Sequence, residues 1–182
     1  MATHEAQRKR LILGAALGLA ALFALWPGRG LAYEDQLGLG VQLAYAHATD
    51  SSLPHSGALL GLEASLGLDD IWSVRGFASY SVHPGTPTLS VAVLGAELLY
   101  LVDILEIVPY FGAGLDALGR WTSGGGGFSA EFGVHPVVGL DWLPSRVWTL
   151  GIEARPVFVV TSWSREPIYV TAGVNAALLF DL

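Results

Sequence analysis

Apolar and polar residues alternate with a period of two along most of the chain after residue 36. In the stretch WTLGIEARPVFV, residues 148–159, Ile152 and Ala154 alternate with Glu153 and Arg155. Successive side chains of a β-strand point to opposite faces, so this period is typical of a strand whose two faces meet different surroundings. The two charged residues therefore share one face, and the two aliphatic residues share the other.

The same alternation recurs in eight segments that are separated by clusters of turn-forming residues. One face of each segment is almost wholly apolar, while the other face carries glycine and nearly all of the mid-strand charges. We predict strands at approximately 36–47, 57–68, 71–82, 88–102, 107–121, 128–142, 147–160 and 167–181.

The charged faces are predicted to point inward, which is the reverse of a water-soluble barrel. An outer surface of Leu, Val, Ala and Trp would aggregate in water but suits a bilayer, where only helices and closed barrels satisfy every backbone group. The predicted segments also exceed the ~9–11 residues that a tilted transmembrane strand needs. The predicted fold class is therefore all-β, an eight-stranded antiparallel up-and-down transmembrane β-barrel.

The first 32 residues have the composition of a secretory signal peptide. Basic residues at positions 8–10 precede an apolar run, Leu11 to Trp26, and small residues at Gly30 and Ala32 suit cleavage. The apolar run is shorter than the roughly 20 residues of a transmembrane helix, so a single membrane anchor is the weaker alternative. We predict a signal peptide over residues 1–32, a barrel domain over residues 33–182, and export to the bacterial outer membrane.

The composition of the predicted mature chain restricts its chemistry. Residues 33–182 hold 5 basic residues, all arginine, and 15 acidic residues. Nucleic acid is not expected as a partner, because binding it needs clustered Lys and Arg. The chain contains no cysteine, which excludes disulfides, thiolate catalysis, Cys-based metal sites and a lipid anchor on cysteine.

The turn-forming clusters place the connections alternately at two ends of the barrel. We predict short periplasmic turns at 69–70, 103–106 and 143–146, and longer outer loops at 48–56, 83–87, 122–127 and 161–167. Pro136 and Pro156 lie inside predicted strands and lack the N–H that a ladder hydrogen bond needs. We therefore predict a β-bulge at each of them.

Aromatic residues collect near the ends of the predicted strands. The alternative explanation is that aromatics are simply common in strands, but few of them lie in mid-strand here. We predict two girdles at the membrane interfaces, because amphipathic rings prefer the headgroup level. The predicted interface aromatics are Tyr45, Trp72, Tyr80, Tyr100, Trp121, Phe128, Trp142, Trp148, Trp163, Tyr169 and Phe180.

Polar residues on the inward faces form a second predicted set, the lumen polar network. Its members are Glu63, Arg75, Glu97, Asp116, Glu131, His135, Glu153, Arg155 and Asn175. Side chains fill an eight-stranded barrel, so these groups must pair with one another. Counting along the hairpins places His135 opposite Arg155 and Glu153 beside Asn175. We predict a charge network that fills the lumen, with a gated polar path or proton relay as the alternative.

The chain resembles the eight-stranded outer-membrane barrels of the OmpA and OmpX type. The resemblance is one of strand pattern and covers the signal peptide and residues 36–182. It extends to YVTAGVNAALLFDL, residues 169–182, which looks like the terminal strand that the outer-membrane insertion machinery reads in such proteins. The resemblance implies outer-membrane lipid and this machinery as partners, and it leaves any surface ligand open.

Three functions follow from these patterns. The favoured one is a small outer-membrane barrel with a structural or surface-interaction role, a plugged polar lumen, and no catalytic site, metal or cofactor. Some barrels of this size modify lipid A with a His and a Ser near the membrane face, and His83 with Ser81 is the nearest match. A narrow passive channel is the third function. His47, His55 and His83 near the outer loops show no metal-ligand spacing.

Overall fold

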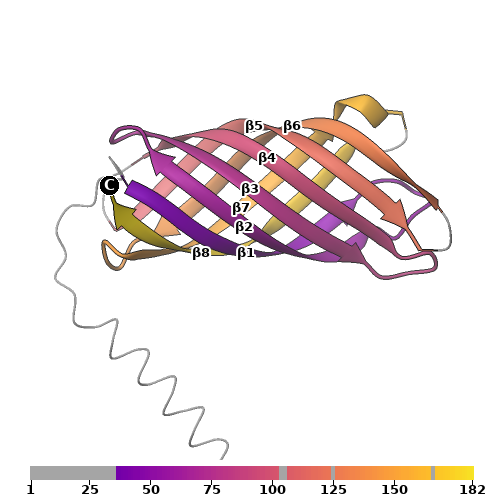
Figure 1. Cartoon of the computed structure of the whole chain (residues 1–182), viewed down its shortest axis with the longest axis horizontal. Coiled ribbons are helices and arrows are strands. Elements are labelled where there is room, and N and C mark those ends of the chain that lie inside the picture. The colour runs from indigo at the N-terminus through magenta and orange to yellow at the C-terminus, as the bar shows by residue number, and fades with distance from the viewer. Residues whose placement is uncertain (1–35, 103–105, 124–125, 165–166) are drawn as a thin grey trace, which may run out of the picture.

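A computed structural model describes residues 36–102, 106–123, 126–164 and 167–182, which form a closed barrel of eight antiparallel strands (Figure 1). The strands are β1 (Gln36–Ala48), β2 (Ser56–Gly67), β3 (Trp72–His83), β4 (Leu89–Leu101), β5 (Ile107–Thr122), β6 (Gly126–Trp142), β7 (Trp148–Val159) and β8 (Ile168–Asp181), and a short 3₁₀ helix, η1 (Val160–Ser162), follows β7. Consecutive strands pair, and β1 closes the barrel on β8. The predicted all-β, eight-stranded architecture is confirmed, and every strand boundary lies within two residues of its predicted position.

The predicted signal peptide, residues 1–32, lies outside the described residues. Among the residues that the structure does describe, no helix has the length and apolar character needed to cross a membrane.

The connections give the barrel two distinct ends, here named the turn end and the loop end. The turn end holds the start of β1, the end of β8 and the connections 68–71, 102–106 and 143–147; the loop end holds the connections 49–55, 84–88, 123–125 and 160–167 (Figure 1). The lengths differ less than the sequence predicted. Because β5 and β6 extend far at the loop end, only residues 123–125 separate them.

The aliphatic faces of the strands form the outer wall of the barrel. Large hydrophobic side chains are exposed on every strand, because the period of two turns them away from the lumen. Examples, one from each strand in order, are Leu43, Leu62, Val74, Leu94, Leu115, Val138, Ile152 and Val174. A continuous apolar wall of this kind is the surface that a bilayer requires.

The prolines of β6 and β7 interrupt the ladder without shifting it. Residue pairs are formed up to Val134–Phe158 and again from Val138–Ala154, and the register is the same on both sides of this gap. Pro136 and Pro156 therefore lie opposite each other in the middle of the gap. The predicted bulges are therefore wrong at these two positions. Each proline removes a hydrogen-bond donor, but no extra residue is inserted, so the pairing resumes in register. A register shift occurs instead in β5, between Arg120 and Thr122.

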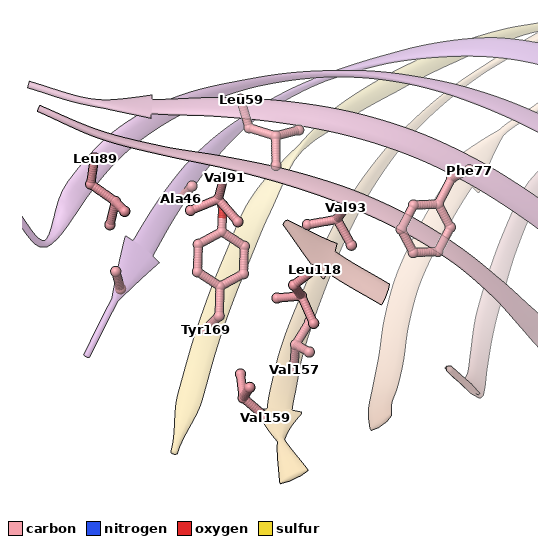
Figure 2. Packing of buried hydrophobic residues seen from close by; sticks show 11 residues of the cluster. Ala46, Leu59, Phe77, Leu89, Val91, Val93, Leu118, Val157, Val159 and Tyr169 are labelled. Carbon is pink, nitrogen blue, oxygen red and sulfur yellow. The ribbon is translucent and has the colours of Figure 1, made fainter. Parts of the chain in front are cut away.

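Apolar side chains fill the lumen toward both ends. The loop-end apolar cluster consists of Ala46, Ala48, Leu59, Phe77, Leu89, Val91, Val93, Leu118, Val157, Val159 and Tyr169 (Figure 2). The turn-end apolar cluster consists of Leu99, Leu101, Val108, Tyr110, Val137, Leu143 and Leu179. Three lumen-facing residues of β4 show this order: Val93 belongs to the loop-end apolar cluster, Glu97 is charged, and Leu99 belongs to the turn-end apolar cluster. Arg75, Glu97, Glu153 and Arg155 lie between the two apolar clusters, whereas Arg120, Glu131 and His83 pair with strand positions of the loop-end cluster.

Candidate functional site

The structure places every residue of the predicted lumen polar network inside the barrel. Glu153 of β7 is 5% exposed, and its carboxylate accepts three hydrogen bonds and forms a further ion pair with Arg155. Arg75 Nη2 (2.6 Å) and Tyr110 Oη (3.0 Å) donate to Oε2, while Gln42 Nε2 (2.7 Å) and Arg155 Nη2 (2.7 Å) reach Oε1. A buried carboxylate is stable only with such partners. Contacts across the lumen therefore explain why Glu153 and Arg155 occur in the otherwise apolar strand β7.

Arg75 of β3 is the hub of the ion network. Its guanidinium contacts three carboxylates, those of Glu97, Glu153 and Glu63, the last at 3.5 Å from Nη1 to Oε2. Glu97 also contacts Arg155, at 3.4 Å from Oε2 to Nε. These charges come from strands on different sides of the barrel, so the ion pairs hold the wall together across the lumen. Removing one member of such a buried network leaves its partners uncompensated.

His135 of β6 bridges two carboxylates. Its Nδ1 lies 2.6 Å from Asp116 Oδ2, and its Nε2 lies 2.9 Å from Glu97 Oε2. A neutral imidazole has one N–H donor, whereas the imidazolium has two. Both contacts are hydrogen bonds from His135 only when the ring is protonated; otherwise one carboxyl group carries the proton.

The counted cross-strand pairs are corrected by the observed register. His135 does not face Arg155, because β6 and β7 pair Gly139 with Glu153, two residues away from the counted register. Asn175 faces Gly151 rather than Glu153. Residue counting across a hairpin depends on where the turn closes, which the alternation of residue types does not determine.

Aromatic rings pack against both central arginines. The Arg155 guanidinium carbon lies 3.9 Å from the centroid of the Phe77 ring, and that of Arg75 lies 5.4 Å from the Tyr110 ring. The Tyr110 ring lies over Gly139 of the neighbouring strand, where a Cβ atom would come within 2.2 Å of the ring. Gly139 therefore makes room for the ring that carries one of the donors to Glu153. These contacts fill the centre of the lumen with side chains.

Several residues that face the lumen are not members of the predicted polar network. Arg120 of β5 lies 3.4 Å from Glu131, measured from Nη1 to Oε2, and both side chains are buried. Gln42, Tyr110 and Asp141 also face inward. Parity provides the signal that finds them, since Arg120 shares the inward face of its strand with Asp116.

Ser81 and His83 form a hydrogen-bonded cluster near the loop end. Ser81 Oγ lies 3.1 Å from His83 Nε2 and 2.7 Å from Tyr169 Oη, and His83 Nδ1 donates to the backbone oxygen of His55 at 3.0 Å. The tautomer with hydrogen on Nδ1 leaves Nε2 as an acceptor for the serine hydroxyl. Both Ser81 and His83 have 0% exposure and face the lumen, so neither side chain reaches the outer wall.

Tyr169 is a correction to the predicted interface aromatics. It is 1% exposed and belongs to the loop-end apolar cluster, where Figure 2 shows its ring inside the barrel. Its odd number places it on the inward face of β8, opposite in direction to Ile168 and Val170. Proximity to a strand end was the wrong criterion for this residue, and parity was the right one.

The other ten predicted interface aromatics are exposed or partly exposed. At the turn end, Tyr100 packs against Trp72 and Phe111 with ring centroids 5.2 Å apart in both pairs. At the loop end, Trp121 contacts Tyr80 at 5.8 Å and Phe128 at 6.4 Å. The aromatic side chains on the outer wall thus gather near both ends of the barrel.

The described part of the chain was expected to hold no metal site of His, Cys, Asp and Glu side chains. Among those residues, no group of three or more His, Cys, Asp or Glu side chains is placed to hold a metal ion. The rings of His47 and His55 stack with centroids 5.7 Å apart at the loop end. His55 Nδ1 is engaged by the Ala48 oxygen at 2.9 Å. Metal ions can also be bound by amide and hydroxyl oxygens, which do not belong to this group of side chains.

No protein-family model matches the chain, and no curated protein matches it by sequence. Solved structures do match. The outer membrane protein OprG from Pseudomonas aeruginosa has 12% identity and a TM-score of 0.64, with 85% of this chain and 100% of OprG covered. Neisserial surface protein A has 15% identity and a TM-score of 0.59, with 81% and 96% covered. Ail, the attachment invasion locus protein of Yersinia pestis, has 11% identity and a TM-score of 0.56, with 81% and 99% covered.

The chain therefore has the fold of the small outer-membrane β-barrels, and the resemblance suggested by its sequence is confirmed. At identities this low, a shared fold carries no residue-level role from one protein to another. What the lumen of this chain does must be argued from its own side chains.

Proposed function

We propose that this protein is a small barrel of the bacterial outer membrane with a structural or surface-interaction role and a lumen closed by its own side chains. The apolar outer wall contacts lipid, and the aromatic side chains near both ends lie at the two interfaces. The turn end faces the periplasm, and the loop end faces the outside. Insertion depends on the machinery that assembles outer-membrane barrels, with β8 as the terminal strand.

The observation that carries this proposal is the three-part filling of the lumen. The loop-end apolar cluster, the central ion network and the turn-end apolar cluster follow one another along the barrel. Water and ions cross a barrel only through a continuous polar path. The side chains of the two apolar clusters are hydrocarbon except for the hydroxyls of Tyr110 and Tyr169, which are already bonded to Glu153 and Ser81. The central arginines, Arg75 and Arg155, are engaged by carboxylates.

The burial of Ser81 and His83 supports a non-enzymatic role. A lipid-modifying serine must meet the ester bond of a lipid, and the geometry of a nucleophile and its base is useful only if substrate reaches it. Ser81 is enclosed by the loop-end apolar cluster and is bonded to Tyr169. We expect Ser81→Ala to leave the lipid A of the host envelope unchanged by mass spectrometry. Loss of a modification in that variant would make the protein an enzyme.

The composition of the loop-end connections indicates which kind of surface ligand the protein can bind. Ail has been solved in complex with the heparin analogue sucrose octasulfate. A sulfated ligand requires arginine or lysine to pair with it. In the sequence, the connections 49–55, 84–88, 123–125 and 160–167 hold a single arginine, Arg165, and no lysine. This scarcity of basic residues supports a surface contact in which pairing with anions has a small part.

The test is a planar-bilayer recording combined with fractionation of the native host. We expect the protein in the outer-membrane fraction, heat-modifiable migration on a gel, and no stable conductance from the purified protein. Protease added to intact cells should cut at residues 124–127 before it cuts at Arg146. Steady ion-selective channels would contradict the closed lumen, and recovery in the inner membrane or earlier cleavage at Arg146 would contradict the location and orientation.

A further inference from the structure

A small cavity lies in the lumen on the turn-end side of the ion network. Its volume is about 30 Å³, enough for one small ion or water molecule. Its polar lining consists of the carboxylates of Glu63 and Asp141, the amide of Asn175, the hydroxyls of Ser65, Ser73 and Thr149, and the guanidinium of Arg75. Leu99, Leu101 and Leu179 of the turn-end apolar cluster close one side. The cavity thus combines a low-dielectric wall with many oxygen atoms.

Asn175 provides the observation that points to a ligand. It is 6% exposed, and its Oδ1 has no hydrogen-bond partner within the described part of the chain. A buried amide oxygen left without a partner is unfavourable, and native proteins rarely retain one. Asn175 lines the cavity, so its unpartnered amide oxygen can accept a contact from a cation or a donor there.

Gly151 keeps the space beside this oxygen open. Gly151 of β7 faces Asn175 of β8. A Cβ atom at position 151 would lie 2.1 Å from Asp141 Oδ1 and 2.2 Å from Asn175 Oδ1. The two oxygens therefore converge on one point from different strands. Any side chain at position 151 would fill that point.

The charges around the cavity favour a cation. The Glu97, Glu153 and Asp116 carboxylates engage the central arginines and His135, as described above. At the cavity itself two carboxylates, those of Glu63 and Asp141, stand against one guanidinium, that of Arg75, which lies 3.5 Å from Glu63. Among the described residues the central and turn-end lumen therefore holds more acids than bases, and its potential is negative.

We propose that this turn-end cavity binds one hard divalent cation of the Ca²⁺ class, with the Asn175 amide oxygen and the Asp141 carboxylate as ligands and Glu63 as a further carboxylate. Carboxylate, amide and hydroxyl oxygens are the ligands that Ca²⁺ takes, whereas Mg²⁺ keeps several of its waters and needs more room. The site goes beyond the structural role proposed above and departs from the expectation of no metal. It does not depend on which membrane holds the barrel.

The experiment uses the mature chain folded in a zwitterionic detergent and stripped with a chelator. Equilibrium binding of radioactive Ca²⁺ and the apparent melting temperature are measured against Ca²⁺ concentration, with Na⁺ at matched ionic strength as the reference. We expect saturable binding of one Ca²⁺ per chain and a melting temperature that rises with the same midpoint, because a ligand of the folded state stabilises it.

Variants at the proposed ligands make the test specific. Asn175→Leu removes the amide oxygen, and Gly151→Ala fills the space between the two oxygens; each should weaken Ca²⁺ binding at least tenfold. Asn175→Asp should bind at least as tightly as the unmodified chain. Thr171→Val is the matched control on the same face of β8, where Thr171 Oγ1 contacts the Arg155 backbone oxygen at 3.5 Å. It should bind Ca²⁺ normally.

Two results would overturn the site. The first is a chain that shows no saturable Ca²⁺ binding beyond the Na⁺ reference, which would assign the cavity to water. The second is unchanged binding in Asn175→Leu or Gly151→Ala, which would place the ion elsewhere. A variant that does not regain heat-modifiable migration has not folded, and its binding is then not compared. In that case Asn175→Asp is the deciding variant. Loss of Ca²⁺ binding in folded Asn175→Asp would contradict coordination by oxygen atoms at position 175.

Discussion

Ile152 and Glu153 are neighbours on β7 and meet opposite surroundings. Ile152 is 58% exposed on the outer wall, where its cross-strand neighbours are the aliphatic Leu140 and Val174. Glu153 is 5% exposed and receives hydrogen bonds from groups on several other strands. The outer side chain needs only surroundings of matching polarity, whereas the inner side chain needs particular hydrogen-bond and ion-pair partners.

This difference separates two kinds of stabilisation in one wall. Lipid can fill the space around any outer side chain of suitable polarity, so outer positions tolerate changes of shape. Lumen positions are enclosed, so changes of shape or charge leave a void or an unpaired group. The following predictions test this contrast, from the largest expected effect to the smallest.

Arg75→Ala should lower the free energy of unfolding by about 3–5 kcal/mol, because it leaves buried carboxylates without their common partner. The measurement is urea unfolding in lipid vesicles, followed by tryptophan fluorescence. Arg146→Ala, at an exposed position of the 143–147 turn, is the control and should behave like the unmodified protein. Similar stability for Arg75→Ala and the control would mean that the ion network contributes little to the barrel.

Leu118→Ala and Leu115→Ala make the same chemical change on the two faces of β5. Leu118 is 2% exposed in the loop-end apolar cluster, and Leu115 is 56% exposed on the outer wall. Leu118→Ala should cost about 2–5 kcal/mol through a cavity that the packed lumen cannot close. Leu115→Ala should cost clearly less, because lipid occupies the vacated volume. Equal costs in the same unfolding assay would remove the distinction between the faces.

Ile152→Arg places a charge on the outer wall and should cost about 2–4 kcal/mol if position 152 lies near the middle of the bilayer. Ile152→Leu keeps volume and polarity and should have almost no effect. The yield of folded, heat-modifiable protein in vesicles measures both. Normal assembly of Ile152→Arg would show that this face does not meet lipid.

Tyr110→Phe removes one of the three hydrogen bonds to Glu153 and should have the smallest effect of the series, on the order of 1 kcal/mol. Its ring still packs over Gly139, and Arg75 still donates to the same carboxylate oxygen. The measurement is again urea unfolding, with Arg75→Ala as the upper reference. A loss equal to that of Arg75→Ala would indicate that the tyrosine hydroxyl, rather than the guanidinium, holds Glu153.

The sequence by itself determined the strands and, wherever polar and apolar residues alternate, which side chains point into the lumen. The period of two is local, because adjacent side chains of a strand must point to opposite faces. It therefore predicted that Glu153 and Arg155 lie inside and Ile152 lies outside, before any partner was known. Applied consistently, the same parity also identifies Arg120 and Tyr169 as lumen residues.

Tertiary structure alone decided which lumen residues meet. The partners of His135 are Asp116 and Glu97, and the convergence of Asp141 with Asn175 above Gly151 follows from the register of β6, β7 and β8. The apolar clusters also escaped prediction, since both faces of β4 are apolar and its alternation gives no direction. Contacts across a lumen depend on hairpin register and barrel closure, which join residues far apart in the chain, whereas alternation records only the nearest neighbours.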